Sequence, residues 1–269
     1  MTSHEPFGGS LSLASRHALV CGASAGIGHA AALALASLGA QVTVLARRAD
    51  KLAEMLPRLR EAGAAGAQCV VADLDDRSRF EPAIRTLLAE HGAVHILVNN
   101  SGGPAPGAVL DSGAGHFDAG FARVLYAAQA MVLACLPGMR AAGFGRIVNV
   151  LSTSAREPIP GLGVGNTVRA AMAGWSKTLS RELPPGVTIN NILPGYTATE
   201  RLQELAALTA QKTGRSIPDI EAEWKREIPE GRLAEPREIG QVIAFLCTPA
   251  AGYVRGQSLA VDGGRMRSL

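Results

Sequence analysis

The sequence predicts a single α/β domain: a doubly wound, seven-stranded parallel sheet of the Rossmann type with helices on both faces. Short β-rich runs alternate with longer helical ones, and a Gly-rich turn follows the first of them. Parallel neighbours need a crossover, so this alternation favours a sheet between two helical layers. The 269 residues, 47% of them hydrophobic, suit one domain over 1–269 with no linker.

The elements are expected in strict alternation. Apolar runs predict seven strands, at 18–21, 41–46, 68–72, 94–99, 146–151, 188–193 and 258–261. Periodic apolar patterns predict helices over 30–38, 51–62, 80–90, 117–141, 167–182 and 236–247. Within 200–230, Leu202, Leu205, Ile220 and Trp224 recur at helical spacing, so two amphipathic helices are expected there. They either form a lid over an apolar substrate pocket or pack on the body without gating.

Composition excludes several classes of function. A formal net charge of +3 without a basic block gives no reason to expect nucleic-acid binding. The four cysteines lie singly, with no CxxC and no nearby His cluster, which favours free thiols in a reducing compartment and no metal site. Residues 1–15 lack signal-peptide features, and no run of about 18 apolar residues predicts a membrane span. We therefore expect a cytoplasmic protein.

The turn after the first strand predicts a phosphate site. The sequence from Gly22 to Gly28 is Gly-Ala-Ser-Ala-Gly-Ile-Gly, and it precedes an alanine-rich helix. Glycines at 22, 26 and 28 permit positive φ, close approach of a ligand and tight packing of helix on strand. Unpaired N–H groups and the helix dipole both favour an anion there, so Ser24 and Ile27 are expected to contact a pyrophosphate. The alternative is a Gly-rich turn without a ligand.

Six motifs in order carry a resemblance that spans nearly the whole chain. They are the Gly22–Gly28 turn, Asp73, Val98-Asn-Asn-Ser-Gly102, Gly145-Arg-Ile-Val-Asn149, Pro194-Gly195 with Thr199, and Val261-Asp-Gly-Gly264. The sequence resembles a short-chain dehydrogenase/reductase and is similar to the β-ketoacyl-ACP reductase-like proteins. The resemblance implies that Asp73, with Leu74, holds the adenine and that Asn99, Ser101 and Gly102 line its ribose. It also implies that Pro194, Gly195, Thr197 and Thr199 meet the nicotinamide end.

The end of the second strand decides between NAD and NADP. An acidic residue there would bind the ribose 2′-hydroxyl of NAD. This strand instead ends in Leu45-Ala46-Arg47-Arg48, with two guanidiniums that can pair with a 2′-phosphate. We therefore predict NADP(H) as the cofactor. The alternative is an ordinary basic pair in a solvated loop.

The catalytic positions depart from the family pattern. The family has a serine after the fifth strand, a tyrosine thirteen residues later, a lysine four beyond that, and an asparagine in the preceding long helix. Ser152 matches the serine, whereas Gly165, Arg169 and Val124 occupy the other three positions. Glycine offers no proton, and a guanidinium does not release its proton near neutral pH. Arg169 can still hydrogen-bond the nicotinamide ribose.

Two hydroxyls remain as possible replacements for the missing acid. Tyr196 directly follows Pro194-Gly195 and is either a substitute acid or an aromatic wall of the pocket, and Ser152 is a weaker acid. Cofactor binding is thus expected to survive while proton delivery is altered. The leading hypothesis is an NADP(H)-dependent oxidoreductase for a small apolar carbonyl or acyl substrate, including 3-oxoacyl thioesters. The alternatives are a catalytically silent NADP(H)-binding sensor or partner protein, and a lyase on the same scaffold.

The long helix and the helix of Arg169 are richer in apolar residues than one buried face requires. Relatives associate through the corresponding helices. A homodimer or homotetramer is therefore expected.

Overall fold

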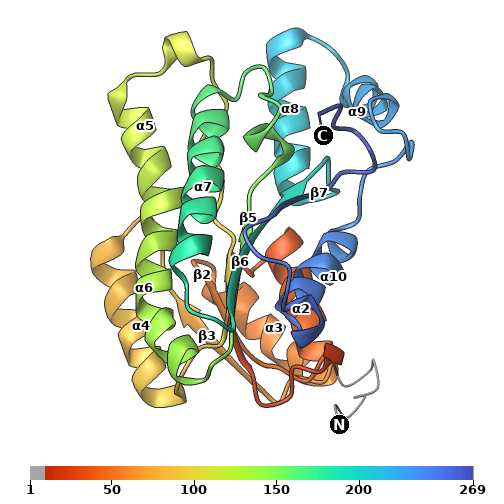
Figure 1. Ribbon diagram of the computed structural model, residues 1–269. Coiled ribbons are helices and arrows are strands. Elements are labelled where there is room, and N and C mark those ends of the chain that lie inside the picture. Colours follow the sequence, from red (N-terminus) through yellow and green to blue (C-terminus); the bar gives the residue numbers. More distant parts are fainter. Residues whose placement is uncertain (1–9, 269) are drawn as a thin grey trace.

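A seven-stranded parallel sheet forms the centre of the protein. The computed structural model describes residues 10–268, and the sheet has the order β3-β2-β1-β4-β5-β6-β7 (Figure 1). The strands are β1 His17–Cys21, β2 Gln41–Ala46, β3 Gly66–Val71, β4 Ile96–Asn99, β5 Gly145–Val150, β6 Val187–Pro194 and β7 Ser258–Val261. All seven pair in parallel, so the predicted single α/β domain is confirmed.

Helices cover both faces of the sheet. They are α2 Gly26–Ser37, α3 Ala49–Glu61, α4 Arg77–His91, α5 Ala114–Phe121, α6 Ala127–Ala141, α7 Gly163–Glu182, α8 Glu200–Thr213, α9 Ile217–Arg226 and α10 Pro236–Cys247. Short 3₁₀ turns lie at Val109–Asp111, Thr153–Ala155 and Pro249–Ala251. In Figure 1, α4, α6 and α7 lie to one side of the strands and α2, α3 and α10 to the other.

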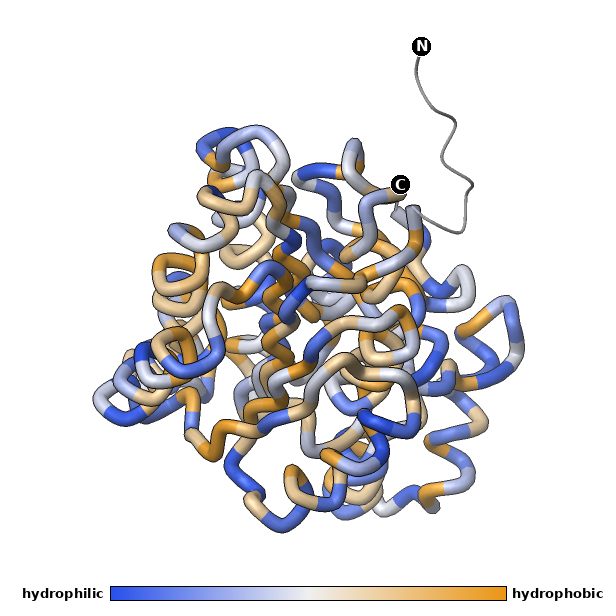
Figure 2. The backbone as a smooth tube through the Cα atoms, turned by 90° about the horizontal axis from the view of Figure 1, so that it is seen from below, coloured by the Kyte–Doolittle hydropathy of each residue, from blue (hydrophilic) through white to orange (hydrophobic). Residues whose placement is uncertain are grey.

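Each face of the sheet has its own core. Leu35, Leu52 and Ile243 belong to the buried cluster under α2, α3 and α10. Phe80 and Met131 belong to the cluster under α4 and α6. Hydrophobic segments gather toward the middle of the molecule and hydrophilic ones follow its outer loops (Figure 2). A strand buried on both faces reads as a continuous apolar run, which is why these strands were recognisable in the sequence.

Several helices begin earlier than predicted, among them α2 at Gly26 rather than at 30 and α4 at Arg77 rather than at 80. The helix of Arg169 begins at Gly163 rather than at 167, because two glycines in its first turn conceal the helical pattern. The Asn166 side chain donates to the Ile159 carbonyl at 2.9 Å and so fixes the entry to this helix. The predicted 117–141 helix begins at Ala114 and contains a π-helical segment, Ala122–Tyr126, between α5 and α6.

The continuous helical stretch Ala114–Ala141 is long and apolar enough to cross a membrane by length and composition alone. No membrane span was predicted from the sequence, because Arg123 and Gln129 interrupt the apolar run. The stretch packs against α4 and α7 within the domain, and 33% of its most apolar window is buried. A single helix of this kind is weak support for a membrane span.

The prediction of free cysteines is confirmed within residues 10–268. All four cysteines are free thiols, three of them buried and Cys69 half-buried. No group of three or more potential metal ligands occurs in this part of the chain. The expectation about a signal peptide concerns residues that lie mostly outside the described range.

Candidate active site

A cleft of about 600 Å³ opens at the carboxyl ends of the strands. Turns and loops after β1, β2, β3, β4, β5 and β6 line it, together with the starts of α7 and α8. From β1 the strands are added toward β3 on one side of the sheet, and from β4 they are added toward β7 on the other side. Ligands of doubly wound sheets bind at such a switch point in strand order, here between β1 and β4. Almost all of the predicted site residues lie here.

The Gly-rich turn forms the floor of the cleft. Gly22 has φ +60°, and a Cβ there would overlap the Asn100 carbonyl oxygen. The Asn100 amide in turn donates to the carbonyls of Cys21 and Gly22 at 3.3 and 3.2 Å. No side chain caps the start of α2, so its first N–H groups are left for an anion. The turn therefore fits a pyrophosphate.

Most predicted residues of the turn line the cleft directly. Gly22, Ser24, Gly26 and Ile27 do so. Gly28 is not a lining residue: it supports the turn from behind, because a Cβ there would overlap the Gly22 carbonyl oxygen. This contact is the tight packing of helix on strand that was predicted for the glycines of the turn, and the contact of Gly28 with the cofactor stays a prediction.

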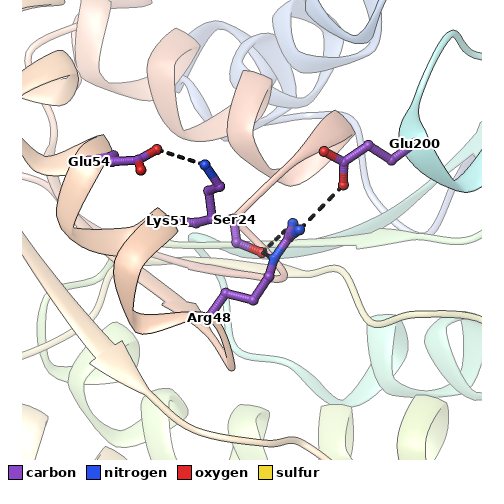
Figure 3. Close-up of polar contacts among 5 residues, drawn as sticks. All are labelled: Ser24, Arg48, Lys51, Glu54 and Glu200. Carbon is purple, nitrogen blue, oxygen red and sulfur yellow. Dashed lines mark hydrogen bonds and ion pairs between the residues drawn. The ribbon is translucent and has the colours of Figure 1, made fainter.

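Two arginines stand where a 2′-phosphate would be recognised. Arg48 donates to the Ser24 hydroxyl at 3.2 and 3.3 Å and pairs with Glu200 at 3.4 Å, so it bridges the Gly-rich turn and the start of α8 (Figure 3). Arg47 lies 3.7 Å from Asp73 and its side chain is 71% exposed. Ion pairs this exposed contribute little to stability, so a 2′-phosphate can compete with Asp73 and Glu200 for the two guanidiniums.

The predicted adenosine contacts divide into two groups. Asp73, Leu74, Ser101 and Gly102 line the cleft. Asn99 lines the small cavity that adjoins the cleft, so its contact with the ribose stays a prediction. Its amide donates to Asn149 Oδ1 at 2.8 Å, inside the sheet. Tertiary pairing of β4 with β5 decides this orientation, which the motif alone does not reveal.

The nicotinamide end is built by the loop after β6. Pro194, Gly195, Thr197 and Thr199 all line the cleft, as predicted. A Cβ on Gly195 would lie 2.8 Å from the backbone of Asp262, so the loop and the chain after β7 pass in close contact. The Thr199 hydroxyl accepts from the Leu202 N–H at 3.3 Å and caps α8.

Three of the four catalytic positions meet at the cleft. Ser152, Gly165 and Arg169 line it. The Ser152 oxygen accepts from the Ser154 N–H at 3.1 Å, which leaves its hydroxyl proton for another partner. Arg169 occupies the space beside residue 165, because a Cβ on Gly165 would lie 2.6 Å from its Nη1. Burial, and then the charge of Arg201, lower the pKa of the Arg169 guanidinium.

Tyr196 is not in the cleft, which corrects its predicted role as a substitute acid. Its ring stacks on Trp224 with centroids 5.0 Å apart, and the Arg265 guanidinium lies over it. Its hydroxyl lies 3.5 Å from Glu227 Oε2. Burial raises the pKa of this phenol, which makes it a weaker acid. Packing of α9 therefore turns the ring away from the reacting centre.

Asn100 belongs to the predicted 98–102 motif, whereas Gly103, Arg123 and Arg201, which also line the cleft, were not predicted. Gly103, Arg123 and Arg201 carried no signal of their own, because their importance depends on neighbours distant in the chain. Arg123 pairs with Asp75, its Nε donating to Oδ1 at 2.7 Å, and Arg201 lies 3.2 Å from Glu204.

Comparison with known proteins agrees with this geometry. Residues 22–265 match the family model described as enoyl-(acyl carrier protein) reductase. The short-chain reductase protein NovJ of Streptomyces niveus is 33% identical over 251 residues, 92% of this chain and 93% of NovJ. The 3-oxoacyl-[acyl-carrier-protein] reductase FabG of Vibrio harveyi is 31% identical over 255 residues, 94% of this chain and 98% of FabG.

A solved structure extends the agreement to three dimensions. L-sorbose reductase from Gluconobacter frateurii, complexed with NADPH and L-sorbose, superposes with a TM-score of 0.90 at 27% identity, covering 97% of this chain and 100% of that one. The chain therefore belongs to the short-chain dehydrogenase/reductase family, as an oxidoreductase of the ketoacyl-reductase-like type.

Proposed function

We propose that the protein is an NADP(H)-dependent oxidoreductase that interconverts a small carbonyl compound and its alcohol, with a proton route that does not use a tyrosine. One observation carries the proposal. The Gly-rich turn, Arg47 and Arg48 line one cleft, and they adjoin an end of it that is lined by Ser152, Gly165 and Arg169. Bound NADPH would supply a hydride to the carbonyl carbon.

Ser152 and Arg169 have separate roles in this proposal. The Ser152 hydroxyl donates a hydrogen bond to the carbonyl oxygen, since its oxygen accepts from the Ser154 N–H and its proton is free. Arg169 holds the reacting partners by hydrogen bonds but does not give up its proton. The proton then reaches the oxygen from water ordered by Ser152.

The cofactor assignment is tested by titrating the protein with NADPH and with NADH. We expect NADPH to bind at least about tenfold more tightly, because a 2′-phosphate gains charge-assisted hydrogen bonds from two guanidiniums. Arg47→Gln should reduce this preference. Equal affinities for the two cofactors in the unmodified protein would contradict the assignment.

The proton route is tested by restoring the family residues. Gly165→Tyr alone would collide with the Arg169 guanidinium, so the double variant Gly165→Tyr/Arg169→Lys is needed. It should raise the reduction of simple ketones or acetoacetyl thioesters by about 10², the contribution of one general acid. Tight NADPH binding with no turnover of any carbonyl, ketoacyl thioester or quinone would instead favour a silent NADP(H)-binding protein. Cleavage of a substrate without consumption of NADPH would favour a lyase.

The remaining expectations form part of the same proposal. Leu202 and Leu205 of α8 line the cleft, which supports a lid over 200–230 and a substrate with an apolar part. The exposed side chains of Tyr126 and Leu133 on the long helix support a homodimer or homotetramer. Four unpaired thiols support a reducing compartment such as the cytoplasm.

A further inference from the structure

The charges that line the cleft leave one arginine without a partner. Within the described chain, five arginines and four carboxylates line it. Each carboxylate pairs with one arginine: Asp73 with Arg47, Asp75 with Arg123, Glu200 with Arg48 and Glu204 with Arg201. Arg169 is the arginine of the cleft that has no carboxylate partner among residues 10–268.

Arg169 is also unusual among the arginines of residues 10–268. It makes no hydrogen bond or ion pair there, yet it is not exposed. The other arginines whose side chains lack such a partner are exposed, apart from Arg16, whose guanidinium lies over the Phe144 ring. A charge withdrawn from water without a partner is costly, so this guanidinium is expected to meet an anion in the working protein.

Two glycines make the space that the guanidinium occupies. A Cβ on Gly103 would overlap Nη2, and one on Gly165 would lie 2.6 Å from Nη1. The loop that carries Gly103 is hydrogen-bonded to the chain around the start of α7, which carries Gly165. The Gly107 N–H donates to Gly161 O at 2.7 Å, and the Gly163 N–H donates to Gly107 O at 2.9 Å. Gly165 stands where the family pattern has tyrosine, and it also leaves the space that the Arg169 guanidinium fills.

We infer that Arg169 binds a carboxylate of the substrate, so that the substrate class is an oxo acid or the corresponding hydroxy acid. This inference rests on the proposed function. A guanidinium pairs with a carboxylate in bidentate fashion, and every carboxylate of the cleft already has another arginine as its partner. Leu162, Leu202 and Leu205 line the same cleft and would receive the apolar part of the acid.

The test uses a carboxylate and its neutral isostere as probes. Hexanoate and hexanamide are titrated calorimetrically into the NADP⁺-saturated protein at constant ionic strength. We expect hexanoate to bind at least about tenfold more tightly, because only the anion gains charged hydrogen bonds from Arg169. Arg169→Gln should abolish this difference, and saturating the variant with NADP⁺ keeps any loss of cofactor affinity from affecting the comparison. Arg47→Gln, which removes the same charge at the other end of the cleft, should weaken NADPH binding and keep the preference for hexanoate.

Several results would overturn the inference. Equal affinity for the two probes in the unmodified protein would do so, whatever the behaviour of the variants. Loss of NADPH affinity in Arg169→Gln with the hexanoate preference intact would assign the guanidinium to the nicotinamide ribose instead. If Arg169→Gln does not fold, Arg169→Lys replaces it, because lysine retains the positive charge. Arg169→Lys should keep a weaker preference for hexanoate, and equal binding of the two probes by this variant would also count against the inference. Failure of NADPH to bind would refute the proposed function, whereas the hexanoate titration can still be made on the protein alone.

Discussion

At Gly28 the fold leaves no room for a side chain. A Cβ there would overlap the Gly22 carbonyl oxygen and lie 2.6 Å from the Asn100 amide nitrogen, and both groups shape the floor of the cleft. By contrast, a Cβ on Gly174 in α7 would have no atom within 4 Å. The same residue type is thus indispensable at one helical position and replaceable at another.

Gly28→Ala and Gly174→Ala form a matched pair that checks this contrast. Gly28→Ala should destabilise the protein and weaken NADPH binding by about tenfold or more, because rigid backbone must move. Gly174→Ala should raise the free energy of unfolding by about 0.5–1 kcal/mol, through helix propensity. Urea denaturation and NADPH titration measure both effects. Normal NADPH affinity in Gly28→Ala would contradict the packing role.

Ser152 and Tyr196 also differ in what their hydroxyls can reach. Tyr196→Phe should leave kcat/KM within about twofold, because the hydroxyl lies by Glu227 outside the cleft. Ser152→Ala should lower kcat/KM by about 10², as removal of a hydrogen bond to a developing oxyanion does. Steady-state kinetics with any carbonyl that the protein reduces will compare them. A large loss in Tyr196→Phe alone would restore Tyr196 as the acid.

Among the elements, four neighbouring strands share a ladder of polar side chains. Asn99 of β4 donates to Asn149 of β5, Asn149 to Asn191 of β6, and Asn191 to Ser258 of β7, at 2.8, 2.9 and 3.0 Å. These residues are directly paired in register. Buried amides that satisfy one another in this way fix the register of the strands that carry the site.

The helices α8 and α9 have a small core of their own. Ala206, Ile220 and Trp224 form a buried cluster separate from the two sheet cores, and Tyr196 packs against it. Arg265 ties the cluster to the chain after β7, since it lies over Tyr196 and pairs with Glu227 at 3.0 Å. A small core attached by a few contacts can open without unfolding the domain.

Trp224→Ala tests this independence. Truncation of a buried tryptophan costs about 3 kcal/mol or more, and here the loss should be local to α8 and α9. Hydrogen exchange of these two helices should accelerate while that of α2 and α10 stays unchanged. Phe245→Ala in α10 is the control, because Phe245 is 42% exposed and lies outside the cluster, so its removal should not alter the exchange of α8 and α9. Faster exchange throughout the molecule would show that the cluster belongs to the main core.

For the whole molecule, a buried histidine makes stability depend on pH. His17 in β1 is 4% exposed, and its Nε2 lies 2.7 Å from the Thr43 hydroxyl. Burial lowers its pKa from 6.5 to about 4. In the unfolded chain the same ring titrates near its ordinary value, so below about pH 6.5 the unfolded state binds more protons than the folded state.

Stability should therefore be complete above about pH 6.5 and fall as the pH drops toward 4. The pKa difference corresponds to a loss of about 3 kcal/mol. His29 and His95, whose pKa values burial also lowers, act in the same direction. Urea denaturation between pH 4 and 8 should show a shallower decline for His17→Gln than for the unmodified protein. His116→Gln, which removes an exposed histidine, is the control, and an unchanged slope in His17→Gln would contradict the assignment.

Assembly is the other property of the whole molecule. Tyr126 and Leu133 are 53% and 58% exposed on a helix that is otherwise well packed. If subunits associate through this surface, Leu133→Arg should yield smaller particles, because a charge cannot be buried there without a partner. Light scattering at micromolar concentration measures the change. A clean monomer of the unmodified protein, at 27.8 kDa, would refute the proposed assembly.

Local sequence patterns predicted the fold, the Gly-rich turn, the arginine pair after β2 and the departure from the family pattern at the catalytic positions. These features depend on local patterns: continuous apolar runs mark strands buried on both faces, and closely spaced glycines mark a turn that needs their backbone freedom. Even the altered positions 165 and 169 could be located, because the motifs on either side of them fix the count of residues.

Only the tertiary structure decided which side chains face the cleft. Tyr196 is two residues from Pro194 in the chain, yet stacking on Trp224 turns it away, and Asn99 is drawn into the sheet by Asn149. The unpaired state of Arg169 within the described chain, in contrast, follows from the pairing of every carboxylate in the cleft with another arginine. Orientation and charge balance depend on contacts between residues far apart in sequence, and no local pattern records these contacts.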